Sequence, residues 1–117
     1  MGAAVTFDYT PEFLRCAKIL SKRYRSFAND IKELCNEITK NPNVGDDLGN
    51  GIRKIRMAIR SKGKGKSGGA RVISLTAVVD EQMSKFTFLY VYDKSEMVNI
   101  SNSKIREILD SNNLGAQ

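Results

Sequence analysis

The hydrophobic pattern of the chain changes its period once, near Gly51, and this change limits the folds that are open to it. Between residues 13 and 38, apolar side chains recur every three or four positions, as they do along one face of a helix. After Gly51 they alternate with polar side chains or form short runs rich in Val, Ile, Phe and Tyr, as in strands. The chain is therefore predicted to place helices first and most of a sheet afterwards.

Two helices are predicted in the first part of the chain, after a short strand over residues 5–9. Thr10 precedes a proline, so it should cap the first helix, with that proline at the first helical position. Ser26 is a candidate cap for the second helix, which should end before Asn41-Pro42. The residues from there to Gly51 are expected to form a loop.

Three strands and a short helix are predicted in the rest of the chain. The strands cover residues 54–60, 71–79 and 86–92. Polar residues 80–85 should join the last two strands as a hairpin, and Ser103 is a candidate cap for the final helix. The fold class is α+β in a single domain over residues 1–117. In it, an antiparallel sheet carries the N-terminal helical pair on one face and ends with a short C-terminal helix.

Basic side chains are concentrated in one part of the chain. Lys and Arg number 19 against 13 Asp and Glu, which gives a net charge of +6. From Leu48 to Val79 there is no acidic residue at all. The basic residues of that stretch are Arg53, Lys54, Arg56, Arg60, Lys62, Lys64, Lys66 and Arg71. Such a concentration of positive charge favours an anionic partner, such as nucleic acid, over the alternative that the charge only makes the protein soluble.

Even spacing along the first of these strands predicts a basic face. Lys54, Arg56 and Arg60 would lie on one side of a strand, and the apolar residues between them on the other. If the apolar side packs on the helices, the basic side lies across the open sheet. Like charges at this spacing repel each other and cost stability, which suggests a bound anion. An ordinary polar strand face is the alternative.

Residues 60–71 read RSKGKGKSGGAR and connect two predicted strands. Glycines allow the backbone to approach a polyanion closely, and the lysines can contact phosphates. The segment ends like a P-loop, but the first glycine of that motif falls on Arg60, and a strand follows instead of a helix. Nucleotide hydrolysis is therefore not predicted.

Missing residue types narrow the chemistry further. The chain has no His, which removes the usual general base and the commonest metal ligand, so no metal site or cofactor is expected. Cys16 and Cys35 fall on apolar stripes, which favours buried thiols in a reducing compartment over a disulfide. Neither a signal-peptide pattern nor an apolar run of membrane-span length is present, so we expect a cytoplasmic protein with no membrane partner.

Three motifs together resemble the RelE/HigB toxins of type II toxin–antitoxin systems. They are GIRKIR at residues 51–56, GKGKSGGARVI at residues 63–73, and VYDK at residues 91–94 with an Asn-Ile-Ser segment after it. The resemblance covers most of the chain, from the helical pair to the final helix. It implies a small α+β fold, cleavage of mRNA in the ribosomal A site, and three partners: the ribosome, mRNA and a cognate antitoxin protein.

The resemblance also implies site residues. The family's basic, metal-independent catalytic side chains fall on Lys54 and Arg56, on Arg71 and on Lys94. Arg56 and Arg71 would hold the non-bridging phosphate oxygens, and Lys54 is the better candidate for proton transfer because Arg does not deprotonate. Further RNA contacts are expected from Arg53, Arg60, Lys62, Lys64, Lys66 and Tyr92. Tyr92 is the nearest substitute for a tyrosine that some relatives carry beyond the last strand, so the general base stays open.

Two other functions stay open. A related toxin of the ParE type inhibits a protein target such as gyrase, but it needs no basic cluster. A non-enzymatic nucleic-acid-binding module would need a stacking platform of exposed aromatic side chains. The aromatic residues with the same parity in the last strand are Phe86, Phe88, Tyr90 and Tyr92. A central strand that is covered on both faces explains them equally well, and burial is the expectation.

Overall fold

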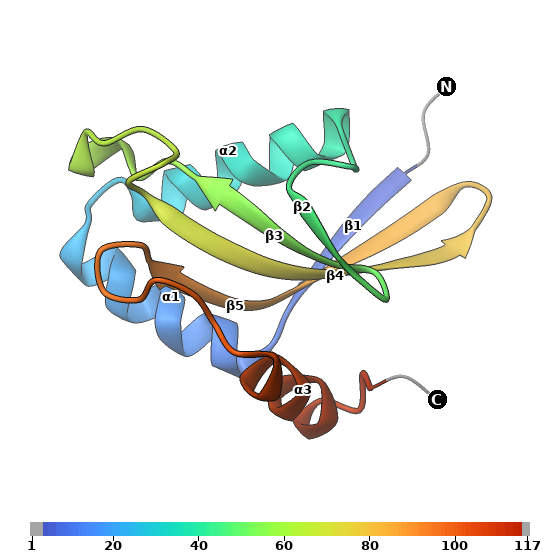
Figure 1. The fold of residues 1–117 in the computed structure, drawn as a ribbon. Helices are drawn as coiled ribbons and strands as arrows, with labels where there is room; N and C mark the ends of the chain where they lie inside the picture. Colours follow the sequence, from blue (N-terminus) through green and yellow to red (C-terminus); the bar gives the residue numbers. More distant parts are fainter. Residues whose placement is uncertain (1–3, 116–117) are drawn as a thin grey trace.

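A five-stranded sheet forms the centre of the molecule, with α2 and α3 on opposite sides of it (Figure 1). The computed structural model describes residues 4–115. The elements are β1 (Ala4–Tyr9), α1 (Pro11–Arg23), α2 (Phe27–Lys40), β2 (Asp46–Gly49), β3 (Ile52–Met57), the 3₁₀ turn η1 (Arg60–Lys62), β4 (Ala70–Asp80), β5 (Met83–Asp93) and α3 (Asn102–Ser111). The strand order in the sheet is β1-β5-β4-β3-β2. The α+β class predicted from the sequence is confirmed.

Of the two helix caps predicted in the N-terminal pair, the one of α1 is confirmed and the one of α2 is not. The Thr10 hydroxyl accepts a hydrogen bond from the Phe13 backbone N–H at 3.0 Å, which satisfies a free donor of the first turn of α1. Ser26 precedes α2, but its hydroxyl donates to the Asp30 carboxylate and accepts from the Ser61 backbone N–H, not from a backbone N–H of α2. At the other end of the chain, Ser101 caps α3, two residues earlier than expected.

The sheet differs from the prediction in three respects. The turn predicted over residues 80–85 is only two residues long, because β4 extends to Asp80 and β5 begins at Met83. β1 pairs with β5 in parallel, whereas every other pair of neighbouring strands is antiparallel. The expected loop before Gly51 contains the short edge strand β2, which pairs with β3. Gly45 and Gly49 adopt φ values of +93° and +92°, so glycines turn the chain at both ends of this strand. A four-residue strand with no alternating apolar pattern leaves little trace in the sequence.

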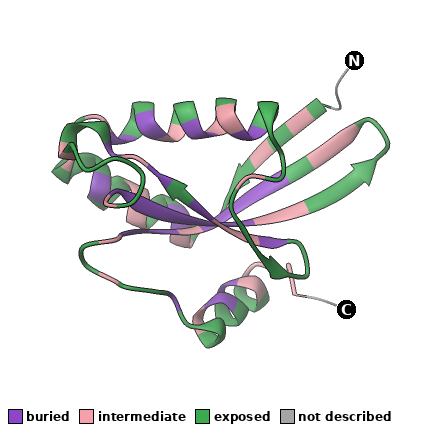
Figure 2. Cartoon of the chain, turned by 45° about the horizontal axis from the view of Figure 1, so that its top comes forward, coloured by how far each residue is buried: buried purple, intermediate pink, exposed green. Residues whose placement is uncertain are grey.

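Both faces of the sheet are covered by hydrophobic clusters, with buried residues running through its centre (Figure 2). Helices α1 and α2 pack on one face, where Phe13, Leu34 and Ile55 belong to the larger cluster. Helix α3 packs on part of the other face, and Ile105 and Ile108 belong to the smaller cluster there. The C-terminal helix therefore lies opposite the helical pair.

An extra residue in β5 changes which side its aromatic residues face. Ile73 of β4 pairs with Tyr90, and its neighbour Ser74 pairs with Phe88, so Leu89 has no partner and forms a β-bulge. Phe86 and Phe88 are fully buried in the cluster beneath α1 and α2. Tyr90 and Tyr92 belong to the cluster on the α3 side. The four aromatic residues therefore lie as two pairs on opposite faces of the sheet. They do not form a single stacking platform, and this agrees with the favoured expectation of burial.

Candidate functional site

Two parallel rows of side chains cross the sheet on the face opposite α1 and α2. In the first row, Arg56 of β3 pairs with Arg71 of β4, and Arg71 pairs with Tyr92 of β5. Residues that are directly opposite in antiparallel strands point to the same side, with Cβ atoms about 5 Å apart. We call Lys54, Arg56, Arg71 and Lys94 the basic face. It combines residues from positions 54 to 94 of the chain, the four for which the family resemblance implies a catalytic role.

A second row of side chains lies beside the first, and the segment between β5 and α3 contacts the lysines of the basic face. Lys54 pairs with Ile73, and Ile73 pairs with Tyr90. The Lys54 ammonium donates to the Asn99 side-chain oxygen at 3.3 Å, so the segment after β5 reaches across to β3. Within that segment, the Lys94 ammonium donates to the Val98 carbonyl at 3.1 Å. Lys54 and Lys94 thus both contact the same short segment, at residues 98–99.

Arg71 is the most buried member of the basic face, with 8% of its surface exposed. Its guanidinium donates to the carbonyl oxygens of Lys66 at 3.0 Å, Ser67 at 3.1 Å and Ala70 at 3.2 Å. The rigid planar fork of an Arg can hold several acceptors at once, which a Lys cannot do. Arg71 therefore fixes the Gly-rich loop to β4 in addition to placing positive charge beside Arg56.

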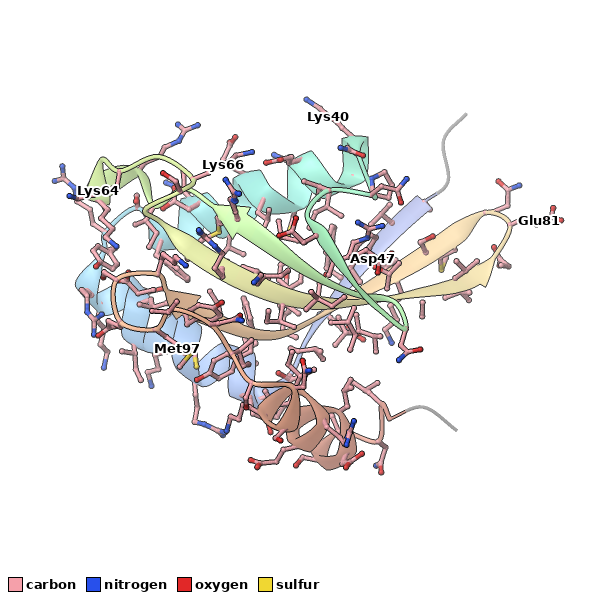
Figure 3. The ribbon with its side chains drawn as sticks, in the orientation of Figure 1. Lys40, Asp47, Lys64, Lys66, Glu81 and Met97 are labelled. Carbon is pink, nitrogen blue, oxygen red and sulfur yellow. The ribbon has the colours of Figure 1, made fainter. Side chains whose placement is uncertain are left out.

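The three lysines of the loop have different surroundings. The Lys62 ammonium lies 2.6 Å from the buried carboxylate of Asp93, and the Lys62 side chain is 12% exposed. The Lys66 ammonium lies 2.9 Å from the carboxylate of Glu37 on α2. Lys64 is exposed and forms no ion pair with the residues at positions 4–115. Figure 3 shows Lys64 at the outer end of the loop, so it is the lysine most accessible to a polyanion.

Asp93, at the end of β5, joins three parts of the chain that are distant in sequence. Its carboxylate accepts hydrogen bonds from Lys62, from the Tyr24 hydroxyl after α1, and from the Ser95 backbone N–H and hydroxyl. The Arg23 guanidinium lies 3.7 Å away. Burial alone would raise the pKa of Asp93, but the hydrogen bonds from Lys62, Tyr24 and Ser95 outweigh it and hold the pKa well below its usual range.

This cluster was not predicted from the sequence. One signal in the sequence is that Asp93 directly follows a nearly continuous apolar strand. A charged residue at such a position is buried if the strand continues through it. Its partner Lys62 was predicted to contact RNA, but the structure places its ammonium on Asp93.

Arg53 and Arg60 do not lie on the basic face. Strand alternation turns Arg53 to the other side, where its guanidinium donates to the carbonyls of Asn43 at 3.0 Å and Gly45 at 3.3 Å. β3 ends at Met57, so the alternation predicted to continue to residue 60 stops there. Arg60 begins the turn η1, with its guanidinium 3.9 Å from Glu33 of α2. The predicted single face of Lys54, Arg56 and Arg60 is therefore wrong for its last member.

Close packing explains why one position of the loop is a glycine. A Cβ on Gly69 would lie 2.1 Å from the carbonyl oxygen of Met57, because the backbone of the loop passes directly over the end of β3. The Gly69 carbonyl also accepts a hydrogen bond from the Lys94 backbone N–H at 3.0 Å. This glycine therefore serves the fold, whereas Gly65 has a φ of +64° and open space around it.

The Tyr92 hydroxyl is a buried polar group at the end of the first row. The residue is 5% exposed, and its oxygen has no hydrogen-bond partner among residues 4–115. Burial raises the pKa of the Tyr92 phenol, and the positive charge of Arg71 opposes this rise without cancelling it. Near neutral pH the phenol is therefore protonated and can donate a hydrogen bond.

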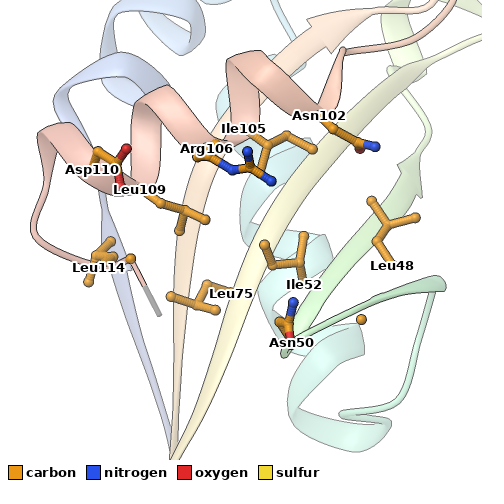
Figure 4. A pocket seen from close by; sticks show the side chains of 12 residues that line it. Leu48, Asn50, Ile52, Leu75, Asn102, Ile105, Arg106, Leu109, Asp110 and Leu114 are labelled. Carbon is orange, nitrogen blue, oxygen red and sulfur yellow. The ribbon is translucent and has the colours of Figure 1, made fainter. Parts of the chain in front are cut away.

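A pocket adjoins the basic face along β3. It has a volume of about 480 Å³ and lies between α3 and the strands β2, β3 and β4 (Figure 4). Ile52 and Leu75 contribute to its wall from the sheet, and Ile105 and Arg106 contribute from α3. Its lining mixes these apolar side chains with polar ones such as Asn102 and Asp110.

Other features predicted from the sequence can be located. Cys16 and Cys35 are free and partly buried, and the sulfur of Cys35 lies 3.9 Å from the Tyr9 hydroxyl. Nowhere in residues 4–115 do three or more Cys, Asp or Glu side chains gather closely enough to hold a metal ion. None of the helices in that range combines the length and apolar character needed to cross a bilayer.

A protein-family model described as the RelE toxin of the RelE / RelB toxin-antitoxin system matches residues 16–113. The chain therefore belongs to the RelE toxin family. Membership of this family implies an antitoxin protein as partner.

Proposed function

We propose that this toxin is a metal-independent endoribonuclease that cuts mRNA on the ribosome in the cytoplasm and so inhibits translation. The observation that carries the proposal is the row of Arg56, Arg71 and Tyr92, with the ammonium groups of Lys54 and Lys94 beside it at residues 98–99. These residues come from three adjacent strands and the segment after them. A structural role explains Arg71 in part, but it does not explain why a second arginine lies directly opposite it.

The reaction that fits this set of groups is transfer of the phosphoryl group within the RNA. The 2′-oxygen attacks the adjacent phosphorus and loses its proton, a pentavalent phosphorane forms, and the bond to the 5′-oxygen breaks as that oxygen gains a proton. The products are a 2′,3′-cyclic phosphate and a 5′-hydroxyl. Arg56 and Arg71 would stabilise the charge that develops on the non-bridging oxygens.

Proton transfer falls to the remaining groups. The ammonium groups of Lys54 and Lys94 contact the adjacent residues Asn99 and Val98, and either can exchange a proton with the attacking or leaving oxygen. The protonated Tyr92 phenol would donate a hydrogen bond to a ribose or phosphate oxygen, which would supply the partner that its buried hydroxyl lacks within residues 4–115. No step of this scheme requires a metal ion or a small-molecule cofactor.

The surroundings of Arg71 support a dependence on the ribosome. Its guanidinium is buried and bonded to carbonyls of the loop, so a phosphate reaches it only when the mRNA is pressed into the face or the loop moves. The ribosome can hold mRNA in such a position. The exposed Lys64, with the surface-paired Lys66 and Arg60, would contact phosphates during docking. Lys62 and Arg53 contribute to the field of positive charge without direct contact.

Single-round cleavage of mRNA on purified ribosomes tests the proposal. Wild-type toxin should cut mRNA only when it is bound in the A site, and the fragments should end in a cyclic phosphate and a 5′-hydroxyl. Fragments with a 5′-phosphate would contradict the phosphoryl-transfer scheme. Ribosome binding without any cleavage would indicate a non-enzymatic binding protein, and inhibition of DNA supercoiling would indicate a toxin that acts on gyrase.

A further inference from the structure

The edge strand β2 places one carboxylate on the side of the sheet that carries the basic face. Asp46 of β2 is the direct cross-strand partner of Lys54 in β3, and Lys54 pairs in turn with Ile73 of β4. Directly opposite residues of antiparallel strands point to the same side of the sheet. The second row of side chains therefore begins at Asp46, on the strand that lies next to β3 (Figure 1).

The neighbours of Asp46 in β2 agree with this direction. Leu48 lines the pocket beside α3, which is on the same side of the sheet as Lys54. Asp47 pairs with Arg53, and its carboxylate lies 4.0 Å from the guanidinium of that arginine on the opposite side. Alternation along the strand therefore turns Asp46 and Asp47 to opposite sides of the sheet.

The two adjacent aspartates also differ in their contacts. The Asp47 carboxylate accepts a hydrogen bond from the Gly49 backbone N–H at 2.8 Å, in addition to its contact with Arg53. Asp46 is exposed and forms no ion pair with any residue at positions 4–115. The two rows hold no other carboxylate in the part of the sheet that the structure describes. Asp46 is therefore available to a ligand bound at the basic face.

The proposed cleavage needs an acceptor for the proton of the 2′-hydroxyl, and the other polar groups of the rows are placed as donors. The two arginines of the first row do not lose their protons. Burial raises the pKa of the Tyr92 phenol, so this group stays protonated near neutral pH. Lys54 and Lys94 donate from their ammonium groups to oxygen atoms of residues 98–99. An ionised carboxylate only accepts hydrogen bonds, which suits Asp46 to the remaining task.

We propose that Asp46 is the general base of the cleavage reaction, an assignment that rests on the proposed nuclease function. Its carboxylate takes the proton of the 2′-hydroxyl, and the electron pair of that O–H bond forms the new bond to phosphorus. The bond from phosphorus to the 5′-oxygen breaks, and a lysine ammonium gives the 5′-oxygen its proton. Solvent then removes the proton from Asp46 and returns one to the lysine.

The register of β2 and β3 supports this assignment. Asp46 lies directly opposite Lys54, and Arg56 is two residues further along β3, so Asp46 and Arg56 are diagonal neighbours. Side chains in this relation have Cβ atoms about 7–8 Å apart. A phosphate held by the long side chain of Arg56 and a 2′-hydroxyl at the Asp46 carboxylate can therefore belong to the same nucleotide.

Single-turnover cleavage on ribosomes at saturating toxin tests the assignment. Asp46→Asn keeps the size of the side chain and should lower the rate by at least about a hundredfold, as expected when a general base is lost. Ribosome binding should be as tight as in wild type or tighter, because the variant removes a negative charge from the basic face. Asp47→Asn is the matched control and should cleave like wild type, because Asp47 faces the other side of the sheet.

A modified substrate separates the base from the acid. When sulfur replaces the 5′-bridging oxygen at the cleavage site, the leaving group departs without needing a proton. A variant that lacks only a proton donor therefore regains its rate on this mRNA, whereas Asp46→Asn should stay slow relative to wild type. Asp46→Glu keeps the carboxylate and should cleave both substrates faster than Asp46→Asn.

The remaining outcomes would overturn the assignment in different ways. Normal cleavage by Asp46→Asn, or its recovery on the sulfur substrate, would remove Asp46 from the role of base and leave the nuclease function intact. Weakened ribosome binding as the sole defect would make Asp46 a binding residue. Absence of cleavage by the wild type would overturn the proposed function and this assignment together. Thermal unfolding of each variant should match wild type, because Asp46 is exposed and forms no ion pair within residues 4–115.

Discussion

The ammonium of Lys62 lies 2.6 Å from the carboxylate of Asp93, which connects the Gly-rich loop to the end of the central strand β5. Asp93 is almost completely buried, and Lys62 is largely so. Such a pair stabilises a fold only while both partners are present, because a single charge left in the interior is strongly unfavourable. The pair therefore holds the Gly-rich loop, which carries the exposed Lys64, to the interior of the protein.

Replacing Asp93 should destabilise the protein strongly. Asp93→Ala leaves the Lys62 ammonium and the Tyr24 hydroxyl without their common acceptor, so we expect a loss of about 3 kcal/mol in the free energy of unfolding. Urea denaturation followed by circular dichroism measures this loss. Glu81→Ala, at the exposed tip of the hairpin between β4 and β5, is the control and should unfold like wild type. Equal stability of the two variants would contradict the role of Asp93.

The same pair predicts a dependence on pH. The pKa of Asp93 is lower in the folded protein than in the unfolded chain, so its ionised form favours folding. This contribution is complete above the unfolded pKa of about 4 and is lost as the pH falls through the lower folded pKa. The difference in stability between wild type and Asp93→Ala should therefore be constant from pH 7 to pH 5 and shrink toward pH 2. A constant difference down to pH 2 would show that the carboxylate's charge contributes nothing.

The loop lysines should separate into a structural and a binding group. Lys62→Gln removes a buried charge partner and should lower the free energy of unfolding by about 2 kcal/mol. Lys64→Gln should leave stability unchanged and reduce the salt dependence of ribosome binding by about 0.7 in the slope of log K against log salt. Denaturation and binding between low and high salt measure the two effects. The division fails if Lys64→Gln unfolds more easily than Lys62→Gln.

Arg71 should be required for the chemical step. Arg71→Ala should lower single-turnover cleavage on ribosomes by about a hundredfold, which corresponds to about 3 kcal/mol of transition-state stabilisation. Arg71→Lys should fail nearly as badly, because Lys keeps the charge but loses the planar fork that also holds Lys66 and Ser67. Ribosome binding and thermal unfolding are measured in parallel. Normal cleavage by folded Arg71→Ala at saturating toxin would mean that this arginine only anchors the loop.

Tyr92→Phe separates a catalytic hydroxyl from a packing residue. Because the hydroxyl is buried without a partner in residues 4–115, its removal should leave stability within about 0.5 kcal/mol of wild type or raise it. If the hydroxyl donates to the substrate, cleavage should fall by at least about tenfold, or 1.4 kcal/mol. Unchanged cleavage would restrict Tyr92 to the hydrophobic cluster under α3.

Local signals in the sequence predicted much of the fold. Helical spacing, the Thr10 cap and the strand composition gave the α+β class and the approximate order of the elements. The basic face was predicted in part, because alternation within β3 holds for Lys54 and Arg56. It failed for Arg60, where the strand ends three residues earlier. Periodicity reports which side a residue faces only while the strand continues.

Pairings between distant residues could not be predicted in the same way. Lys62 and Asp93 meet because the turn η1 lies against the end of β5, and nothing in the local composition of either segment indicates the other. The bonds from Arg71 to the carbonyls of its own loop depend on the path of the backbone, which the sequence of a Gly-rich segment leaves open. The parallel pairing of β1 with β5 likewise depends on how the helical pair returns the chain to the sheet.

The bulge at Leu89 makes the length of β5 more important than its composition. Phe88 and Tyr90 are two residues apart, yet they face opposite sides because one residue between them is unpaired. Deleting Leu89 alone would restore regular alternation and leave Phe88 and Tyr90 with their partners on β4 and on their own sides of the sheet. Deleting a paired residue instead would turn either the phenylalanines out of the main core or the tyrosines away from Arg71. Variation in this strand should therefore accumulate as exchanges of one apolar side chain for another, while changes in its length are tolerated at position 89 and at no other position between residues 86 and 92.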